Sequence, residues 1–581
     1  MSRRSIRTTI PHSPNGDEGW NNEARTPEKE FMINKPGTKL NVFHMDFNYV
    51  SLRLEYVRDW LLQLKGLGFN AILWELEDKV QWETCPECVW PEALTKKEFR
   101  ELLDYSRLLG MEPIPLLQTV GHGEYVLMHE RYRPFRELDG HHDCYCVSNP
   151  GVTRFLGAWV EEYLELFGDI RHFHLGGDEA YVFAKCPKCS AHAAKQGRNT
   201  LFGNHIRALA EPVLKKNIRP GIWNDMIIKD PEDLGFDRKR YVIWDWNYWD
   251  TDKTPEKVNL HGLGCFSRER LQHSGILKEF PELADNTGRP RPFGSVQILK
   301  KLGFDVVLCS ASRSDGDSFS CPAPFHAGNI AGAAKTAATE NLLGHCVTSW
   351  AIRMNDYTSQ IPYIGLATYA RTRAEKSSEE LFSGYCRTLF GADPGKFIKA
   401  TSMLGAGMAP FTSGVTVSGV QWNTLKDSLP PPKGHLKKYL ADLENRDPAR
   451  LRAFPGAIRK SISDITEGIN LLSEFLAEAK SGFDIIEAWL AGARFLMSTA
   501  LAGDRIMREG GGLEMATVLE HEKKAYDAFL RRHENPLSAA KNAGLVYDAS
   551  IDFFRNREES RPSLSWLNAL PVGNEKQTQN I

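Results

Sequence analysis

The sequence lacks two kinds of apolar segment. No apolar run is long enough to span a membrane, and no apolar stretch follows the charged N-terminal residues, as a signal peptide would require. Residues 1–38 are polar instead, which predicts a disordered or extended arm. We therefore expect a cytoplasmic protein with no membrane partner.

Nucleotide-binding loops and strong net charge are also missing. No Gly-rich dinucleotide or phosphate loop follows any predicted strand. The formal net charge of −2 gives no reason to expect a nucleic acid partner. The 11 cysteines are odd in number and no secretion signal precedes them, which favours reduced thiols. With 581 residues, the chain is long enough for two or three domains.

Strand-like and helix-like segments alternate across residues 39–375. The predicted strands cover residues 41–46, 70–77, 111–119, 171–176, 218–225, 241–246, 304–310 and 344–350. Predicted helices between them include residues 53–66, 95–109 and 151–167. Eight apolar strands separated by helices favour an α/β fold, a (β/α)8 TIM barrel, over an open doubly wound sheet.

Polar or aromatic residues end almost every predicted strand, which also favours the barrel. In a barrel they all lie on one rim, where such enzymes carry their active sites, whereas an open sheet would gather its site at one switch point. The candidate rim residues are Asp46, Glu75, Glu77, His122, Asp178, Glu179, Asp225, Asp245 and Trp350.

Strand signals vanish after residue 376. Apolar residues recur at helical spacing from Ile458 to Leu476 and again from Ile486 to Ala500. We expect residues 376–581 to form an α-helical C-terminal domain with a polar tail. It would pack on the barrel or on another subunit, which leaves a homodimer open.

Two adjacent carboxylates, Asp178 and Glu179, follow the fourth predicted strand and two glycines. Such a pair often only begins a helix, because acidic residues complement the helix dipole. Glycines at a strand end instead favour close approach of a ligand. The pair therefore predicts acid/base chemistry on a bound small molecule.

Two Cys-x-x-Cys pairs, Cys85 with Cys88 and Cys186 with Cys189, follow the second and fourth strands. Their four thiolates would suit a structural zinc site on the rim. Free thiols in two proline turns are the alternative, and Cys144 and Cys146 on the intervening loop are competing ligands. Because four thiolates close the site, this zinc would brace the rim without taking part in catalysis.

A family resemblance extends over residues 41–375. The segment HFHLGGDEA resembles the His-x-Gly-Gly-Asp-Glu signature of family 20 glycoside hydrolases, the β-N-acetylhexosaminidases. Preceded by ILWELED, IPLLQTVGHGEYV and SNP and followed by CPKC, it resembles the hexosaminidase D branch in order and spacing. Residues 376–581 bring no resemblance.

The resemblance implies a retaining, substrate-assisted mechanism without a catalytic cofactor. The substrate's 2-acetamido oxygen attacks the anomeric carbon, Glu179 is the general acid and then base, and Asp178 orients and stabilises the acetamido group. Two adjacent carboxylates suppress each other's ionisation, so we expect Glu179 to stay protonated near neutral pH.

Pocket residues can be assigned in the same way. Tryptophans at strand ends enclose the acetamido methyl and the sugar face in this family, which implies Trp223, Trp244 and Trp350, although barrel core is the alternative for each. The family tyrosine that binds the acetamido oxygen is missing after strand seven, so Tyr248 is the candidate. Asp46, Glu75, His122 and Asp225 are the remaining predicted substrate-binding residues.

The sequence therefore predicts an exo-acting β-N-acetylhexosaminidase that acts on carbohydrates with a terminal β-linked GlcNAc or GalNAc. A carbohydrate-binding protein with weak or no catalysis on the same barrel is the alternative. A zinc-dependent hydrolase using the cysteines is disfavoured, because all-cysteine sites are usually closed and structural.

Overall fold

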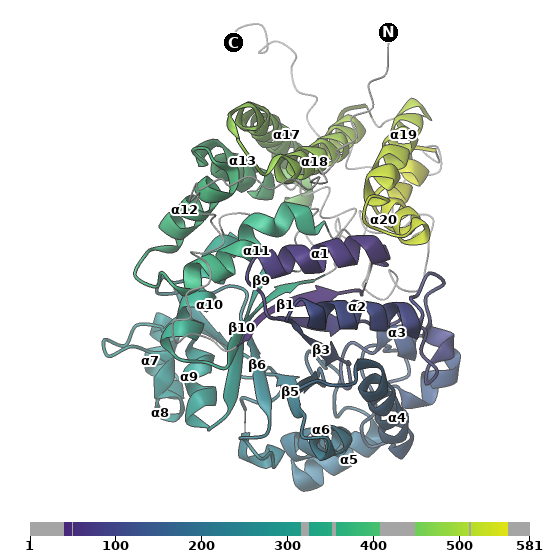
Figure 1. The fold of residues 1–581 in the computed structure, drawn as a ribbon, viewed down its shortest axis with the longest axis vertical. Coiled ribbons are helices and arrows are strands. Elements are labelled where there is room, and N and C mark those ends of the chain that lie inside the picture. The colour runs from purple at the N-terminus through teal and green to yellow at the C-terminus, as the bar shows by residue number, and fades with distance from the viewer. Residues whose placement is uncertain are drawn as a thin grey trace, which may run out of the picture. The chain divides into compact units, whose positions relative to one another are not determined.

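The strands form a closed barrel, and helices lie around it (Figure 1). The computed structural model describes residues 40–48, 50–229, 231–314, 325–350, 356–406, 448–509 and 513–555. All strand pairs of the barrel are parallel, in the order β1-β10-β9-β6-β5-β4-β3-β2. This confirms the predicted (β/α)8 barrel. The strands are β1 Leu40–Asp46, β2 Ala71–Glu75, β3 Glu112–Leu116, β4 His172–His174, β5 Arg219–Trp223, β6 Val242–Trp246, β9 Asp305–Arg313 and β10 Gly344–Ser349.

Successive residues of a strand pack on opposite sides of the barrel wall. In β1, Val42 belongs to the inner cluster with Trp223 and Trp244, whereas Phe43 packs outward against Trp60 of the helix that follows β1. Alternation of side chains along a strand requires this division, and both faces are apolar because helices cover the outer one. The polar residues that end the strands are thereby left at the carboxyl rim.

Helices connect most of the strands, and their boundaries follow local signals. Thr95 and Glu98 form a reciprocal capping box that begins α2, and the Asn149 side chain accepts from the Gly151 N–H where α4 begins. The connecting helices are α1 Leu54–Gly66, α2 Lys96–Leu108, α4 Pro150–Phe167, α5 Pro187–Gln196, α6 Arg198–Lys215, α9 Gly294–Lys301, α10 Phe325–Thr339 and α11 Tyr357–Arg371.

The connection from β6 to β9 holds structure that the sequence did not predict. It contains an antiparallel hairpin, β7 Lys257–Leu260 and β8 Gly264–Ser267, followed by α7 Arg268–His273 and α8 Ile276–Glu279. The hairpin and these helices bury an apolar cluster of their own, which includes Val258, Phe266 and Leu271. The hairpin turn brings His261 to the rim.

In the described residues that follow the barrel, the regular elements are all helices, as predicted. Ile465, Leu472 and Trp489, three of the apolar positions expected to face a shared core, are buried. Among the described residues, no helix combines the length and the apolar character needed to cross a membrane. The predicted boundary at residue 376 stays a prediction, and the predicted arm at 1–38 lies outside the described residues. These helices are α12 Ser378–Phe390, α13 Gly395–Ala406, α17 Pro448–Glu478, α18 Phe483–Glu509, α19 Leu513–Leu530 and α20 Pro536–Arg555.

The helical region bonds directly to the barrel. The Trp489 indole donates to the Ser359 carbonyl of α11 at 3.0 Å. Leu52, after β1, forms an antiparallel bridge with Glu534, between α19 and α20. The Ser51 N–H donates to the Ser538 hydroxyl at 2.9 Å. The helices after the barrel therefore hold the β1–α1 loop.

Glu534 makes this junction sensitive to pH. Its carboxylate is fully buried and accepts from the Ser538 hydroxyl at 2.8 Å and the Asn542 amide at 2.7 Å. Burial raises its pKa from 4.5 to about 7, and those two hydrogen bonds only partly oppose the change. A raised carboxyl pKa stabilises the fold fully below the unfolded pKa, and this contribution is lost as pH rises through the folded pKa.

We expect Glu534→Gln to reduce the dependence of stability on pH. The amide keeps an acceptor for Ser538 and Asn542 but cannot ionise. The wild type should lose up to about 1.4 kcal/mol of unfolding free energy per pH unit, relative to the variant, as pH rises from 4.5 towards 7. Denaturant unfolding across this range measures the difference, with exposed Glu101→Gln as control. Parallel wild-type and Glu534→Gln curves would contradict the assignment.

Candidate active site

The turn after β4 places both predicted catalytic carboxylates at the carboxyl rim. Gly176 and Gly177 adopt φ values of 62° and 91°, and Glu179 itself adopts 46°. The positive φ of Gly176 favours glycine, and a Cβ there would also lie 2.2 Å from the Gln118 side-chain oxygen and displace it. A positive φ at a glutamate is strained, and such strain is commonly found at functional sites. The local sequence therefore gives Glu179 an orientation that a regular strand end would not.

His122 lies between the two carboxylates. Its Nε2 is 3.3 Å from Asp178 Oδ2 and 3.5 Å from Glu179 Oε2. The neighbouring Gly121 allows the close approach, because a Cβ there would meet the Asp178 carbonyl oxygen at 2.1 Å. His122 also has a positive φ of 51°. The prediction that His122 belongs to this site therefore agrees with its position.

The ionisation of the carboxylate pair differs from the expectation. Burial raises the pKa of Asp178, and the charge of Glu179 adds to the effect while His122 opposes it. Burial alone would also raise the pKa of Glu179, but hydrogen bonding and the charge of His122 bring it below its ordinary value. The expectation that Glu179 stays protonated is thus wrong for the ligand-free site. Glu179 is the more exposed carboxylate, with 35% of its side chain accessible against 8% for Asp178.

The protonation of His122 follows from the same contacts. Burial alone would lower its pKa, but the charge of Asp178 and the hydrogen bonds to both carboxylates raise it well above its ordinary value. These contacts favour the protonated imidazole, whose positive charge offsets that of the carboxylate pair in the absence of a ligand.

Asp225, after β5, orients the turn that carries Asp178 and Glu179. Its Oδ2 accepts from the Glu179 backbone N–H at 2.8 Å, and its Oδ1 accepts from the Trp246 indole at 3.2 Å. Burial and the charge of Asp178 raise the pKa of Asp225 to about 7. The predicted rim residue thus joins the carboxylate turn to the end of β6.

Glu75 and Asp46 lie deeper than predicted for hydroxyl-binding groups. Glu75 is 2% exposed and accepts from the Gln118 amide at 2.9 Å. Its other oxygen lies 2.8 Å from His44 Nε2, and the His44 ring packs against Trp350 at 4.6 Å. Asp46 is 1% exposed and accepts from the Asn48 N–H at 2.7 Å. Because protein groups already hydrogen-bond both carboxylates, Glu75 and Asp46 are better suited to positioning neighbouring rim residues than to binding a sugar hydroxyl.

The predicted tryptophans lie at different depths. Trp223 and Trp244 are 0% and 1% exposed and belong to the core inside the barrel, as the alternative interpretation held. Trp350 is partly exposed, 6.0 Å from the Trp223 ring. Tyr248 lies 5.3 Å from Trp246, and burial raises its pKa well above the usual value, which keeps the hydroxyl protonated. Trp350 and Tyr248 therefore remain the better candidates for ligand contacts.

Three rim residues were missed at the level of the sequence. Trp246 follows Trp244 by two residues, so both side chains lie on the same face of β6. Trp246 is nearer the carboxyl end of the strand and therefore lies at the rim, whereas Trp244 is buried inside the barrel. Its ring packs on His261 at a centroid distance of 4.0 Å. Tyr181 is largely exposed and hydrogen-bonds the Glu179 carboxylate. Strand alternation could have identified Trp246, but nothing in the sequence places His261 here.

The predicted four-cysteine site requires a correction. Cys85 and Cys88 form a disulfide with one another, three residues apart in a single turn, so they are neither reduced nor available as thiolate ligands. Cys186 and Cys189 are free and buried, and they gather with Cys146 and Glu137. The prediction missed this cluster because it chose Cys85 and Cys88 as the second pair of ligands. In the structure Cys146, which was only a competing ligand, lies beside Cys186 and Cys189.

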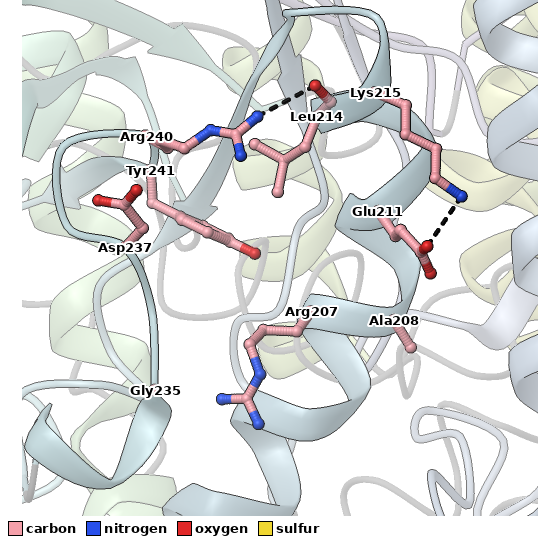
Figure 2. A pocket seen from close by; sticks show the side chains of 9 residues that line it. All are labelled: Arg207, Ala208, Glu211, Leu214, Lys215, Gly235, Asp237, Arg240 and Tyr241. Carbon is pink, nitrogen blue, oxygen red and sulfur yellow. Dashed lines mark hydrogen bonds and ion pairs between the residues drawn. The ribbon is translucent and has the colours of Figure 1, made fainter.

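A surface hollow of about 660 Å³ lies beside α6 (Figure 2). It is bounded by the end of α6, which leads into β5, and by residues 235–241, which lead into β6, so it lies at the amino ends of these strands. Arg240 donates to the Leu214 carbonyl at 3.0 Å, and Lys215 pairs with Glu211 at 2.8 Å. Because barrel enzymes bind substrate at the carboxyl ends of the strands, the hollow is not the catalytic site.

Part of the chain is similar in sequence to known glycoside hydrolases. Residues 38–264 match the model of the glycosyl hydrolase family 20 catalytic domain. Hexosaminidase D of Homo sapiens is 29% identical over 204 residues, 34% of this chain and 41% of that protein. Hexosaminidase D of Bos taurus is 28% identical over 248 residues, 41% of this chain and 69% of that protein. The chain thus spans less than half of the human relative.

The solved structure of a beta-N-acetylhexosaminidase from Bacteroides fragilis superposes with a TM-score of 0.43 and 15% identity, covering 57% of this chain and 66% of that chain. The family match ends at residue 264, before β9 and β10, whereas the predicted resemblance continues to residue 375. The matched segment holds the turn with Asp178 and Glu179, and also His122 and Asp225. Residues 38–264 of this chain are thus similar to the catalytic domain of glycosyl hydrolase family 20, and hexosaminidase D proteins are among its relatives.

Proposed function

We propose that this protein is an exo-acting β-N-acetylhexosaminidase that removes terminal β-linked GlcNAc or GalNAc with retention of configuration. The observation that carries the proposal is the strained turn after β4, which presents Asp178 and Glu179 together with His122. The family match and the names of the two hexosaminidase D relatives support the same activity.

In the proposed mechanism, the substrate supplies its own nucleophile. The 2-acetamido oxygen attacks the anomeric carbon while Glu179 donates its proton to the leaving glycosidic oxygen. Asp178, buried beside the pair, orients the acetamido N–H and stabilises the positive charge that develops on the cyclised intermediate. Water then attacks the anomeric carbon, Glu179 takes a proton from it, and the acetamido group is released intact.

Substrate binding must convert Glu179 into an acid. In the ligand-free site its pKa lies below the ordinary value because the hydrogen bond and the charge of His122 favour the anionic form and outweigh burial. A bound sugar would cover Glu179, exclude water and strengthen the desolvation that already opposes ionisation. We infer that the proton for the leaving group is taken up by Glu179 as the substrate binds.

The rim residues have complementary roles in this proposal. Asp225 holds the Glu179 backbone and the Trp246 indole, so it positions the acid without contacting the sugar. Trp350 and Trp246 offer partly exposed aromatic faces for the sugar ring. Tyr248 keeps its hydroxyl proton, so it can donate to the acetamido oxygen.

An aryl glycoside series tests the activity. We expect release from aryl N-acetyl-β-glucosaminide or N-acetyl-β-galactosaminide and essentially none from the matching β-glucoside or β-galactoside, which lack the nucleophilic oxygen. The ratio of initial rates on the two N-acetyl sugars reports the preferred sugar.

Cleavage of the plain glycosides at comparable rates would contradict substrate assistance and require a protein nucleophile. Binding of N-acetylhexosamine without release from any aryl glycoside would instead support the carbohydrate-binding alternative.

A further inference from the structure

Three thiols and one carboxylate gather on the rim beside the catalytic turn. This rim cluster consists of Glu137, Cys146, Cys186 and Cys189, all buried, with one potential ligand atom of each within 4.8 Å of the others. Glu137 and Cys146 come from the loop between β3 and α4, and the other two begin α5 after β4. The residues come from two loops that are adjacent in the barrel but distant in sequence.

The spacing of the sulfurs fits one tetrahedral metal ion. Cys146 Sγ lies 3.5 Å from Cys186 Sγ and 3.7 Å from Cys189 Sγ. A tetrahedral zinc with Zn–S bonds of about 2.3 Å holds its sulfurs about 3.8 Å apart. The thiols are therefore already close to the separation that a shared ion would impose.

The surrounding hydrogen bonds suit thiolate ligands. The Cys189 backbone N–H points at Cys186 Sγ at 3.3 Å, a contact that stabilises negative sulfur. Glu137 Oε1 accepts from the Cys186 N–H at 2.8 Å, which fixes the carboxylate. Its Oε2 is buried and has no hydrogen-bond partner among the described residues. A buried, oriented oxygen without a partner costs free energy unless a cation lies beside it.

We propose that the rim cluster binds one structural Zn²⁺ through Cys146, Cys186, Cys189 and Glu137. Three thiolates and one carboxylate are ligand types that zinc accepts, and thiolates select against magnesium and calcium. The four protein ligands leave no position for a metal-bound water, so this ion does not activate a nucleophile.

The ion would join the two loops that build the active site. The β3–α4 connection carries His122 as well as Glu137 and Cys146, and the β4–α5 segment carries Asp178 and Glu179 before Cys186. A bond between these loops would hold the His122 ring against the two carboxylates. This site does not depend on the proposed hydrolase activity, because metal binding can be measured without substrate.

Metal content of the purified full chain tests the proposal. We expect about one zinc per chain, as for a closed structural site, and less than a tenth of that in Cys146→Ser and Cys189→Ser. Glu137→Gln should retain zinc but release it to a chelator faster than the wild type. Cys88→Ser, in the disulfide pair, and Cys265→Ser, at an exposed free cysteine, should retain full zinc.

Cobalt substitution gives a spectroscopic signal that a misfolded protein would not produce. Protein produced with Co²⁺ should show the visible bands of a tetrahedral site and the ultraviolet thiolate charge transfer. Cys88→Ser should keep both, and Cys146→Ser should lose them. A metal-free wild type with full stability would overturn the proposal, as would a disulfide between two cluster cysteines. Zinc loss in Cys88→Ser with retention in Cys146→Ser would overturn the ligand set.

Discussion

Glu179→Gln is expected to lower turnover of an N-acetylhexosaminide with a poor leaving group by about 10²–10⁴-fold, the range for loss of a general acid. The amide fits the same turn and can still meet His122, but it has no proton to give to the glycosidic oxygen. An activated aryl glycoside should be less affected, because a nitrophenolate leaves without full protonation. Kinetics on a disaccharide and on a nitrophenyl glycoside measure the two losses.

Glu130→Gln is the matched control, since this exposed glutamate lies on the same rim connection as His122. It should leave both rates unchanged. Equal losses on the two substrates in Glu179→Gln would remove Glu179 from the acid role.

Asp178→Asn is expected to reduce turnover by about 10²–10³-fold, the effect of removing one preorganised electrostatic contact from a transition state. The replacement keeps an acceptor oxygen but removes the buried anion that faces the positive intermediate. It also removes the main charge that holds the proton on His122, so the pKa of His122 should fall. NMR titration of the His122 ring in the ligand-free protein measures this second effect.

A thiazoline analogue of the cyclised intermediate separates charge from shape. It should bind the wild type far more tightly than the product sugar, and Asp178→Asn should weaken the thiazoline while leaving product affinity nearly unchanged. Asp139→Asn, at an exposed carboxylate of the β3–α4 loop, is the control. Near-normal turnover in Asp178→Asn would contradict substrate assistance, and Asp46, Glu75 and Asp225 would become the candidate nucleophiles.

Periodicity was sufficient to predict the barrel. Each barrel strand falls within a few residues of its predicted range, because buried parallel strands are continuous apolar runs that end in polar residues. The same reasoning predicted that Asp178 and Glu179 lie at the carboxyl rim, because they follow the fourth predicted strand. The β7–β8 hairpin was missed because its short strands, half exposed, carry little apolar pattern.

Depth and ionisation could not be predicted in this way. Trp244 and Trp246 share one face of β6, and only the register of the closed barrel shows which of them reaches the rim. The pKa values of Asp178 and Glu179 depend on His122. This residue follows β3 and is distant in sequence from the two carboxylates, which follow β4, but it lies beside both of them in the structure. From their adjacency in the sequence we expected a raised pKa for Glu179, whereas the raised pKa belongs to Asp178.

The cysteines illustrate a third limit. The spacing of a Cys-x-x-Cys pair is compatible with a metal knuckle and with a local disulfide, and the chain contains one example whose sulfurs are bonded and one whose sulfurs are free. Cys146 precedes Cys186 by 40 residues and completes the cluster only because the β3 and β4 loops are neighbours in the barrel.

The junction at Leu52 bears on whether this barrel is a transferable module. The Arg53 N–H donates to the His533 carbonyl at 2.9 Å, and the Asn535 amide donates to the Leu52 carbonyl at 3.2 Å. A gene fusion or truncation that ended the chain after β10 would leave these polar groups of the β1–α1 loop without their partners. That loop follows Asp46 directly, so its loss of order would reach the rim. Recombination could therefore exchange this barrel between proteins only together with its C-terminal helices.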